Sequence, residues 1–96
     1  MNPLNKQLHA FYQAAKWRIQ NEFNGYVCCA LEDAWVMNQN KFKKWLWKVA
    51  DIEFQRHFKH LAIPGCVCQA FWPGGDIQSR MAALDTMISL CKKNYF

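Results

Sequence analysis

Residues 2–25, NPLNKQLHAFYQAAKWRIQNEFNG, carry the clearest helical pattern in the chain. Apolar side chains recur every three or four residues, so one stripe of this helix faces a core. The stripe consists of Leu4, Leu8, Phe11, Ala15, Ile19 and Phe23. Asn2 suits the N-cap and Pro3 the first helical position, where its missing N–H costs nothing. Gly25 can supply the left-handed conformation that often ends a helix. We therefore predict a helix over residues 3–23.

Two further helices are predicted near residues 26–37 and 41–61. The first is apolar almost all round, which favours a buried central helix, with a short strand at 26–31 as the alternative. The second has a polar stripe at spacings of three and four, with a kink at Asp51 as a further possibility. That stripe consists of Lys41, Lys44, Lys48, Asp51, Gln55 and Lys59.

The C-terminal third predicts a connector and a last helix. Pro64 pushes the residue before it out of helical geometry, and an apolar, irregular or extended connector follows at residues 66–72. A turn at Pro73-Gly74-Gly75 precedes Asp76, which can cap a helix near 76–92. The predicted buried stripe of this helix consists of Ile77, Met81, Leu84, Ile88 and Cys91. The prediction is an all-α, four-helix bundle-like single domain over residues 1–96. Its expected core is Leu8, Phe11, Ile19, Leu31, Leu46, Val49, Met81, Leu84 and Ile88.

Composition narrows the class of protein. The chain is 52% hydrophobic and 16% aromatic, which is typical of a packed core and not of disorder. No apolar run is long enough to span a membrane. Five cysteines, an odd number, and an N-terminus without an apolar signal core predict free thiols in the cytoplasm. The net charge of +5 fits a nucleic acid, an anionic lipid or an acidic protein, and separates none of them.

No motif in the sequence predicts catalysis. The nucleotide-binding, serine-hydrolase and zinc-protease patterns are absent, so we expect neither an enzyme nor a cofactor. Cys28, Cys29 and Cys91 lie in apolar segments, where cysteine usually acts as a small hydrophobe. No His or Lys falls within one turn of Cys28 or Cys29 to lower a thiol pKa.

A weak metal constellation spans the second half of the third predicted helix and the segment after it. Glu53, His57 and His60 share one helix face at spacings of four and three, and Cys66 and Cys68 come shortly after. Zinc accepts all three ligand types, although a C-x-C spacing is not the usual one. The alternative is that Glu53 simply pairs with His57 across one turn. No metal is assigned, and a zinc-stabilised domain remains a secondary hypothesis.

A basic run predicts a possible nucleic-acid surface. Its lysines are Lys41, Lys43, Lys44 and Lys48, interleaved with Phe42, Trp45 and Trp47. Single-strand binders combine cations with aromatic platforms in this way. The chain has only three arginines, none in this run, and arginine is the usual reader of guanine. The alternative is an ordinary solvated helix face.

Trp17 is the sharpest candidate for a protein-binding residue. It projects from the first helix away from the apolar stripe, beside Ala10 and Ala14 and next to Lys16 and Arg18. Large aromatics are frequent anchors of protein interfaces. The alternative is that Trp17 packs against a second neighbouring helix. The candidate partner-binding residues are Trp17, Lys16, Arg18 and Trp47.

Two stretches resemble small uncharacterised bacteriophage and prophage accessory proteins. Residues 29–34, CALEDA, are similar to a C-x-L-x-x-A element, and residues 80–88, RMAALDTMI, to an R-x-x-x-L-D-x-x-I ending. The resemblance covers about fifteen residues, mostly core positions, and carries over no functional residue. It implies a protein that inhibits or modulates a host protein or a defence or nuclease complex. Such a partner is expected to have an acidic surface and to lie in the host cytoplasm.

Overall fold

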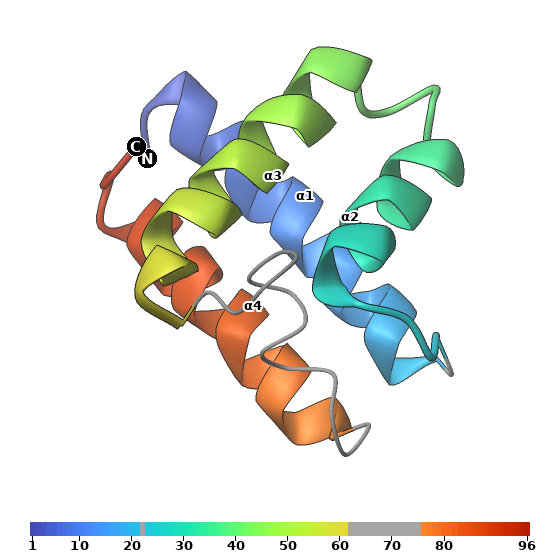
Figure 1. Cartoon of the computed structure of the whole chain (residues 1–96). Helices are drawn as coiled ribbons and strands as arrows, with labels where there is room; N and C mark the ends of the chain where they lie inside the picture. The colour runs from blue at the N-terminus through green and yellow to red at the C-terminus, as the bar shows by residue number, and fades with distance from the viewer. Residues whose placement is uncertain (22, 62–75) are drawn as a thin grey trace.

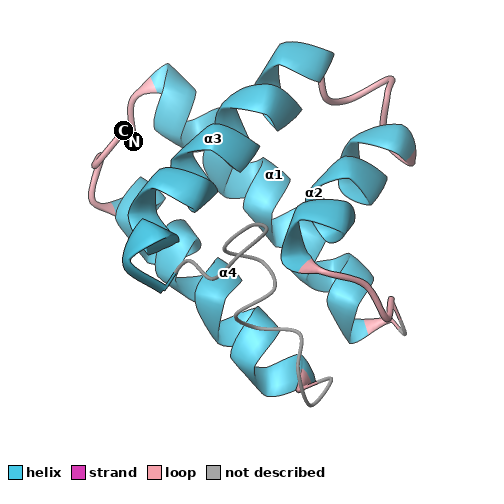
Figure 2. Cartoon of the chain, viewed as in Figure 1, coloured by secondary structure: helices cyan, strands magenta, loops and turns pink. Residues whose placement is uncertain are grey.

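The protein is all-α, as predicted. The computed structural model describes residues 1–21, 23–61 and 76–96, and these residues form four α-helices, one 3-10 turn and no strand (Figure 1, Figure 2). The elements are α1 (Pro3–Gln20), α2 (Val27–Val36), α3 (Lys44–Phe58), η1 (Lys59–Leu61) and α4 (Ile77–Lys92). The predicted connector at 66–72 lies outside the described residues.

Helix α1 takes the central position. It packs against all three other α-helices, most extensively against α4, and runs behind α3 in the view of Figure 1. The prediction that the helix near 26–37 is central is therefore wrong. The reason is that α2 turns Cys29, Glu32 and Val36 to solvent, so its apolar composition does not make it buried on every side. In α1, by contrast, a wide stripe is fully buried, comprising Leu8, Phe11, Tyr12, Ala15 and Ile19.

The ends of α1 combine one confirmed prediction with one correction. The Asn2 side chain accepts a hydrogen bond from the Asn5 backbone N–H at 2.8 Å, so Asn2 is the N-cap. The helix ends at Gln20, earlier than predicted, because the backbone of Asn21 leaves helical geometry (φ -106°, ψ 49°). The Asn21 side chain caps this end by donating to the Trp17 carbonyl at 2.8 Å. Gly25 is not left-handed. It lies close to Phe23, whose Cε1 would be 2.6 Å from a Cβ at Gly25.

Helix α3 begins at Lys44 and not at Lys41. The backbone N–H groups of Lys41 and Phe42 donate to the Asn38 carbonyl at 2.9 and 2.8 Å, so this segment closes a turn after α2. Lys41 and Lys43 therefore lie in the α2–α3 turn, outside any helix. The α-helix continues through Asp51 to Phe58, and the last turn is 3-10.

Seven of the nine predicted core residues are buried. The two exceptions, Val49 and Met81, are partly buried at the edge of the core. The Tyr12 hydroxyl also lies inside, where it donates to the Ala50 carbonyl at 2.6 Å and so joins α1 to α3. Burial raises the pKa of this phenol, which stays protonated.

The buried face of α4 is rotated from the predicted one. Ile77 is 40% exposed, whereas Arg80 is only 1% exposed. Arg80 reaches inward and its Nη1 donates to the carbonyls of Phe23 and Gly25 at 3.1 and 2.9 Å. An arginine can bury a long aliphatic stem while its guanidinium satisfies backbone acceptors. Arg80 thereby fixes the α1–α2 connection against the start of α4.

Asp51 is the unusual member of the polar stripe on α3. Its carboxylate is half-buried, and its Oδ1 is enclosed without a hydrogen-bond partner among the described residues. Burial raises the pKa of Asp51, and the nearby Glu32 adds to the shift, while Gln55 and Lys48 oppose it. The ionised form at neutral pH therefore weakens the folded state.

Replacing Asp51 with asparagine is expected to raise the melting temperature at pH 7. A carboxyl whose pKa is higher in the folded state favours folding when protonated, so wild type gains stability as the pH falls through this titration. The two proteins should therefore converge in thermal melts at acidic pH. The control is Asp85→Asn, because exposed Asp85 pairs with Lys16 at 2.7 Å and gains nothing from neutralisation. A lower melting temperature for Asp51→Asn at pH 7 would contradict this account.

Candidate functional site

Trp17 stands out from the surface of α1. Its side chain is 56% exposed, whereas the apolar stripe on the other side of the helix is fully buried. The predicted direction of Trp17 is thus confirmed, and a neighbouring helix does not bury the ring. The backbone at this point is fixed, since the Trp17 carbonyl accepts from both the main chain and the side chain of Asn21.

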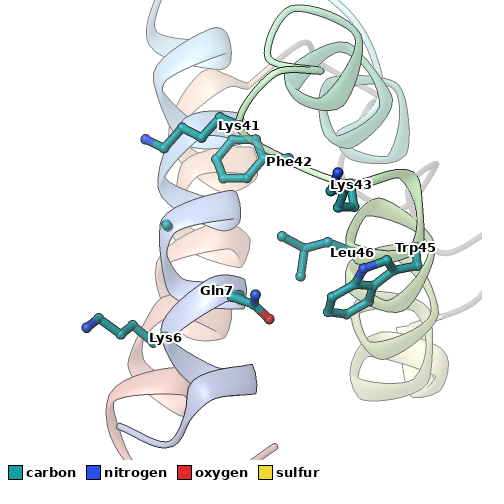
Figure 3. A pocket seen from close by; sticks show the side chains of 8 residues that line it. Lys6, Gln7, Lys41, Phe42, Lys43, Trp45 and Leu46 are labelled. Atoms are coloured by element: carbon teal, nitrogen blue, oxygen red, sulfur yellow. The ribbon is translucent and has the colours of Figure 1, made fainter.

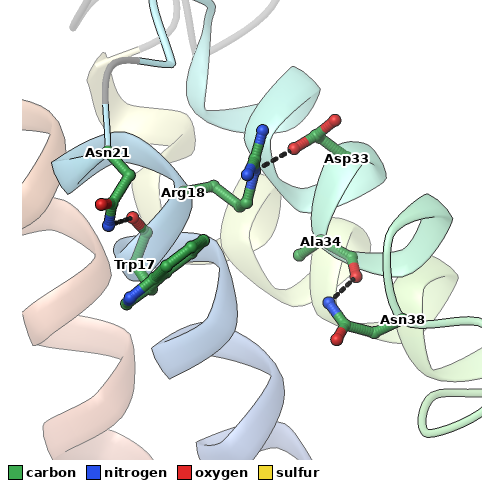
Figure 4. Close-up of polar contacts among 6 residues, drawn as sticks. All are labelled: Trp17, Arg18, Asn21, Asp33, Ala34 and Asn38. Carbon is green, nitrogen blue, oxygen red and sulfur yellow. Dashed lines mark hydrogen bonds and ion pairs between the residues drawn. The ribbon is translucent and has the colours of Figure 1, made fainter.

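A groove lies between Trp17 and the end of α2. Its volume is about 310 Å³, and we call it the Trp17–Met37 groove. Its lining residues are Ala14, Trp17, Arg18, Met37 and Asn38. Met37 is 61% exposed, and the Asn38 side chain is held by a 2.7 Å hydrogen bond to the Ala34 carbonyl (Figure 4). The groove therefore has a rigid aromatic on one wall and a flexible thioether on the other.

The two cations beside Trp17 are already paired. The Arg18 Nε donates to Asp33 of α2, as Figure 4 shows, and the guanidinium lies 5.7 Å from the Trp17 ring centroid. Lys16 pairs with Asp85 of α4 at 2.7 Å. The surface around Trp17 is therefore close to neutral, and its character is mainly apolar.

A second groove of about 300 Å³ lies between the first half of α1 and the start of α3. We call it the Lys6–Trp45 groove. Its lining residues are Lys6, Gln7, Ala10, Lys41, Phe42, Lys43, Trp45 and Leu46. Figure 3 shows Phe42 and Leu46 toward the inside, with the ammonium groups of Lys6 and Lys41 pointing out on the same side. Trp45 is 48% exposed at the other edge. The groove has an apolar floor and a basic rim.

Trp47 lies elsewhere, against α2. Its ring stacks on Trp35 with centroids 4.9 Å apart and planes at 8°. Lys48 places its ammonium 4.3 Å from the Trp47 centroid, and Lys44 lies 5.8 Å from that of Trp35. The structure does not bring Trp47 together with Trp17, Lys16 and Arg18, and the faces of this tryptophan pair are largely occupied.

The four lysines of the basic run are all exposed, but their aromatic neighbours are not equally so. Phe42 is buried and meets Phe11 edge-to-face at 5.2 Å, and Trp47 is stacked as described. Of the three interleaved aromatics, only Trp45 presents a largely exposed ring. The run therefore offers cations without the row of open platforms that single-stranded nucleic acid uses.

The candidate metal ligands are dispersed in the part of the chain that the structure describes. Glu53 pairs with Arg56 at 2.8 Å and not with His57, which instead packs edge-on against Phe58 and Tyr95. His60 is exposed in η1. No three His, Cys, Asp or Glu side chains gather among the described residues, and Cys66 and Cys68 fall outside them.

None of the described cysteines is in a disulfide bond, and two differ from the expected burial. Cys91 is buried, and burial raises its pKa to about 11. Cys29 is exposed and Cys28 partly buried, because α2 turns this side to solvent. Partial desolvation and the adjacent Cys28 raise the pKa of Cys29, which keeps it a thiol near neutral pH. Cys29 and Cys91 therefore lack the lowered thiol pKa of an activated nucleophile.

Two wall residues of the grooves, Lys6 and Met37, were not singled out by sequence reasoning. For Lys6 a signal exists, because Lys6, Ala10, Ala14 and Trp17 are spaced by four, four and three and share one helix face. For Met37 none exists, since its position beside Trp17 depends on how α2 packs against α1.

None of the described helices is long and apolar enough to cross a membrane. Comparisons of the chain with protein-family models, curated proteins and solved structures found no match. The grooves beside α1 are therefore interpreted from their own geometry and chemistry.

Proposed function

We propose that this protein is a non-enzymatic binding protein of the phage accessory kind, which inhibits or modulates a host protein or complex by direct contact. The observation that carries the proposal is the pair Trp17 and Met37, both more than half exposed and forming the walls of one groove. Tryptophan, methionine and arginine are enriched at protein interfaces, and all three line this groove.

The geometry fits an interface anchor. A tryptophan supplies a large contact area and has few rotatable bonds to immobilise, and Arg18 is already held in place by Asp33. Met37 can adapt its shape to a partner side chain. Binding at this groove therefore has a low ordering cost at Trp17 and Arg18, and Met37 is the wall that becomes ordered with the partner.

Affinity purification from a bacterial lysate tests the proposal. Replacing Trp17 with alanine is expected to lose at least about 2 kcal/mol of binding, roughly 30-fold in Kd, and thus to release proteins that wild type retains. The matched control is Ile52→Ala, since Ile52 is 52% exposed on α3 and lines neither groove. Equal retention by wild type and Trp17→Ala, quantified by mass spectrometry, would exclude Trp17 as the anchor.

A further inference from the structure

The geometry points to one continuous docking strip along α1 that takes an acidic, amphipathic helical segment of a protein partner. This inference rests on the proposed function, because the strip includes the Trp17–Met37 groove, and it names the chemistry of the partner. The strip joins that groove to the Lys6–Trp45 groove.

The first wall of the strip is a single face of α1. Gln7 and Ala10 line one groove, and Ala14 and Trp17 line the other. Their spacings of three, four and three place all four on one side of the helix. From Gln7 to Trp17 the helix rises about 15 Å, the length of roughly three helical turns.

The second wall is the turn between α2 and α3, which runs antiparallel to α1. Met37 and Asn38 lie opposite the second half of α1, and Lys41 to Lys43 lie opposite the first half. Phe42 fastens this turn to α1 through its edge-to-face contact with Phe11. Both walls therefore extend along both grooves.

The spacing of the two hollows matches a helical ligand. The α1 residues that line the first groove are Lys6, Gln7 and Ala10, and those that line the second are Ala14, Trp17 and Arg18. Gln7 and Ala14, like Ala10 and Trp17, are seven residues apart and thus about 10 Å apart along α1. Side chains at positions i and i+7 of a bound helix have the same separation. One apolar side chain of the partner can therefore occupy each hollow.

The charge of the strip selects an acidic partner. Lys6, Lys41 and Lys43 are exposed and form no ion pair with any described residue. Among the described residues that line the two grooves there is no Asp or Glu. Carboxylates flanking the apolar positions of the partner would meet these lysines at the rim, where they favour fast association and orientation.

A protein segment fits the strip better than a nucleic acid. The floors are apolar, formed by Ala10, Phe42 and Leu46 in one groove and by Ala14 in the other, and they suit aliphatic or aromatic side chains. A nucleic-acid strand needs several open aromatic faces, and only Trp45 offers one in the basic run.

The test uses a yeast-displayed library of random peptides of about 14 residues, the length that spans the strip. Wild type is expected to select peptides rich in Asp and Glu with apolar residues at i, i+3 or i+4, and i+7. For synthetic copies of these peptides, measured by fluorescence polarisation, Lys6→Glu/Lys43→Glu should raise Kd by about tenfold or more. Trp17→Ala should raise Kd by roughly 30-fold or more.

Lys44→Glu/Lys48→Glu is the matched control. It makes the same change in net charge, at two lysines of the basic run that lie outside both grooves, so Kd should stay within about twofold of wild type. Circular dichroism of every variant checks that the helices are retained.

Each remaining outcome overturns the strip. If the selected peptides lack acidic residues, or if acidic peptides bind Lys6→Glu/Lys43→Glu as tightly as wild type, the basic rim is excluded. If peptide affinity falls with Trp17→Ala and not with the lysine pair, the strip is excluded but Trp17 is retained as the anchor of the proposed function. If peptide affinity falls with Lys6→Glu/Lys43→Glu and not with Trp17→Ala, the peptides bind the Lys6–Trp45 groove alone, and Trp17 is excluded as the anchor. If no peptide is selected, both the docking strip and the Trp17 anchor are excluded. Binding of labelled oligo(dT) at about 50 mM salt, weakened by both lysine pairs, identifies a nucleic-acid face instead.

Discussion

Replacing Arg80 with alanine is expected to lower the free energy of unfolding by about 3–5 kcal/mol. The substitution leaves the carbonyls of Phe23 and Gly25 without this donor in a part-buried site, and an acceptor left unsatisfied in the interior costs roughly 1–3 kcal/mol. It also empties the space of a side chain that is 1% exposed. Domains of this size have only about 5–15 kcal/mol of stability, so the variant is expected to be marginally folded. Urea unfolding followed by circular dichroism measures the change.

Arg80→Met separates the two contributions. Methionine retains much of the buried aliphatic volume but donates no hydrogen bond, so this variant is expected to lose less than Arg80→Ala. The exposed Arg56, which pairs with Glu53 on its own helix, provides the control substitution Arg56→Met with little effect. Wild-type stability for Arg80→Met would show that the two carbonyls do not depend on Arg80.

Replacing Leu84 with alanine is expected to cost about 2–5 kcal/mol, from lost transfer energy plus the cavity left behind. Leu84 is fully buried on α4, in the helix that packs most extensively against α1. Lys44→Ala, on the exposed face of α3, is expected to change stability by no more than about 0.5 kcal/mol. Thermal melts of both variants give the comparison, and greater damage from Lys44→Ala would contradict the orientation of α3 and α4.

Much of the fold was predictable because helical periodicity and capping are local properties. The stripe of α1 and the caps Asn2 and Asp76 are present as expected, and each cap side chain accepts a backbone N–H. The helix start at Lys44 was not predictable in this way. It depends on the Asn38 carbonyl, which accepts from the two residues that would otherwise begin α3.

Arg80 lies on the buried face of α4 although arginine is usually an exposed residue type. It lies four, seven and eleven residues before Leu84, Met87 and Cys91, so the periodicity places it on the buried side. The predicted stripe shares Leu84, Ile88 and Cys91 with the buried face but includes Ile77 and Met81 in place of Arg80, because arginine is a residue type that is mostly exposed. The carbonyls that accept from Arg80 are 55 and 57 residues away in the sequence, so a local sequence pattern does not predict these hydrogen bonds.

Only one of the two walls of the docking strip was predictable from local sequence patterns. One wall of the docking strip is a helix face, and the exposure of Trp17 follows from the phase of that helix. The other wall is the α2–α3 turn, whose position against α1 depends on the contact between Phe42 and Phe11. Pairing across the chain also explains why Lys16 and Arg18, which look like free cations in the sequence, are neutralised by Asp85 and Asp33.

The packing of α1 against α4 has a consequence for synthesis on the ribosome. Helix α1 has its most extensive contact with α4, and residues 21–76 must be translated between them. At about 5–20 residues per second, this takes roughly 3–11 s. During that interval part of the apolar face of α1 has no partner to cover it, so the nascent chain is a natural client for chaperones that bind exposed hydrophobic segments.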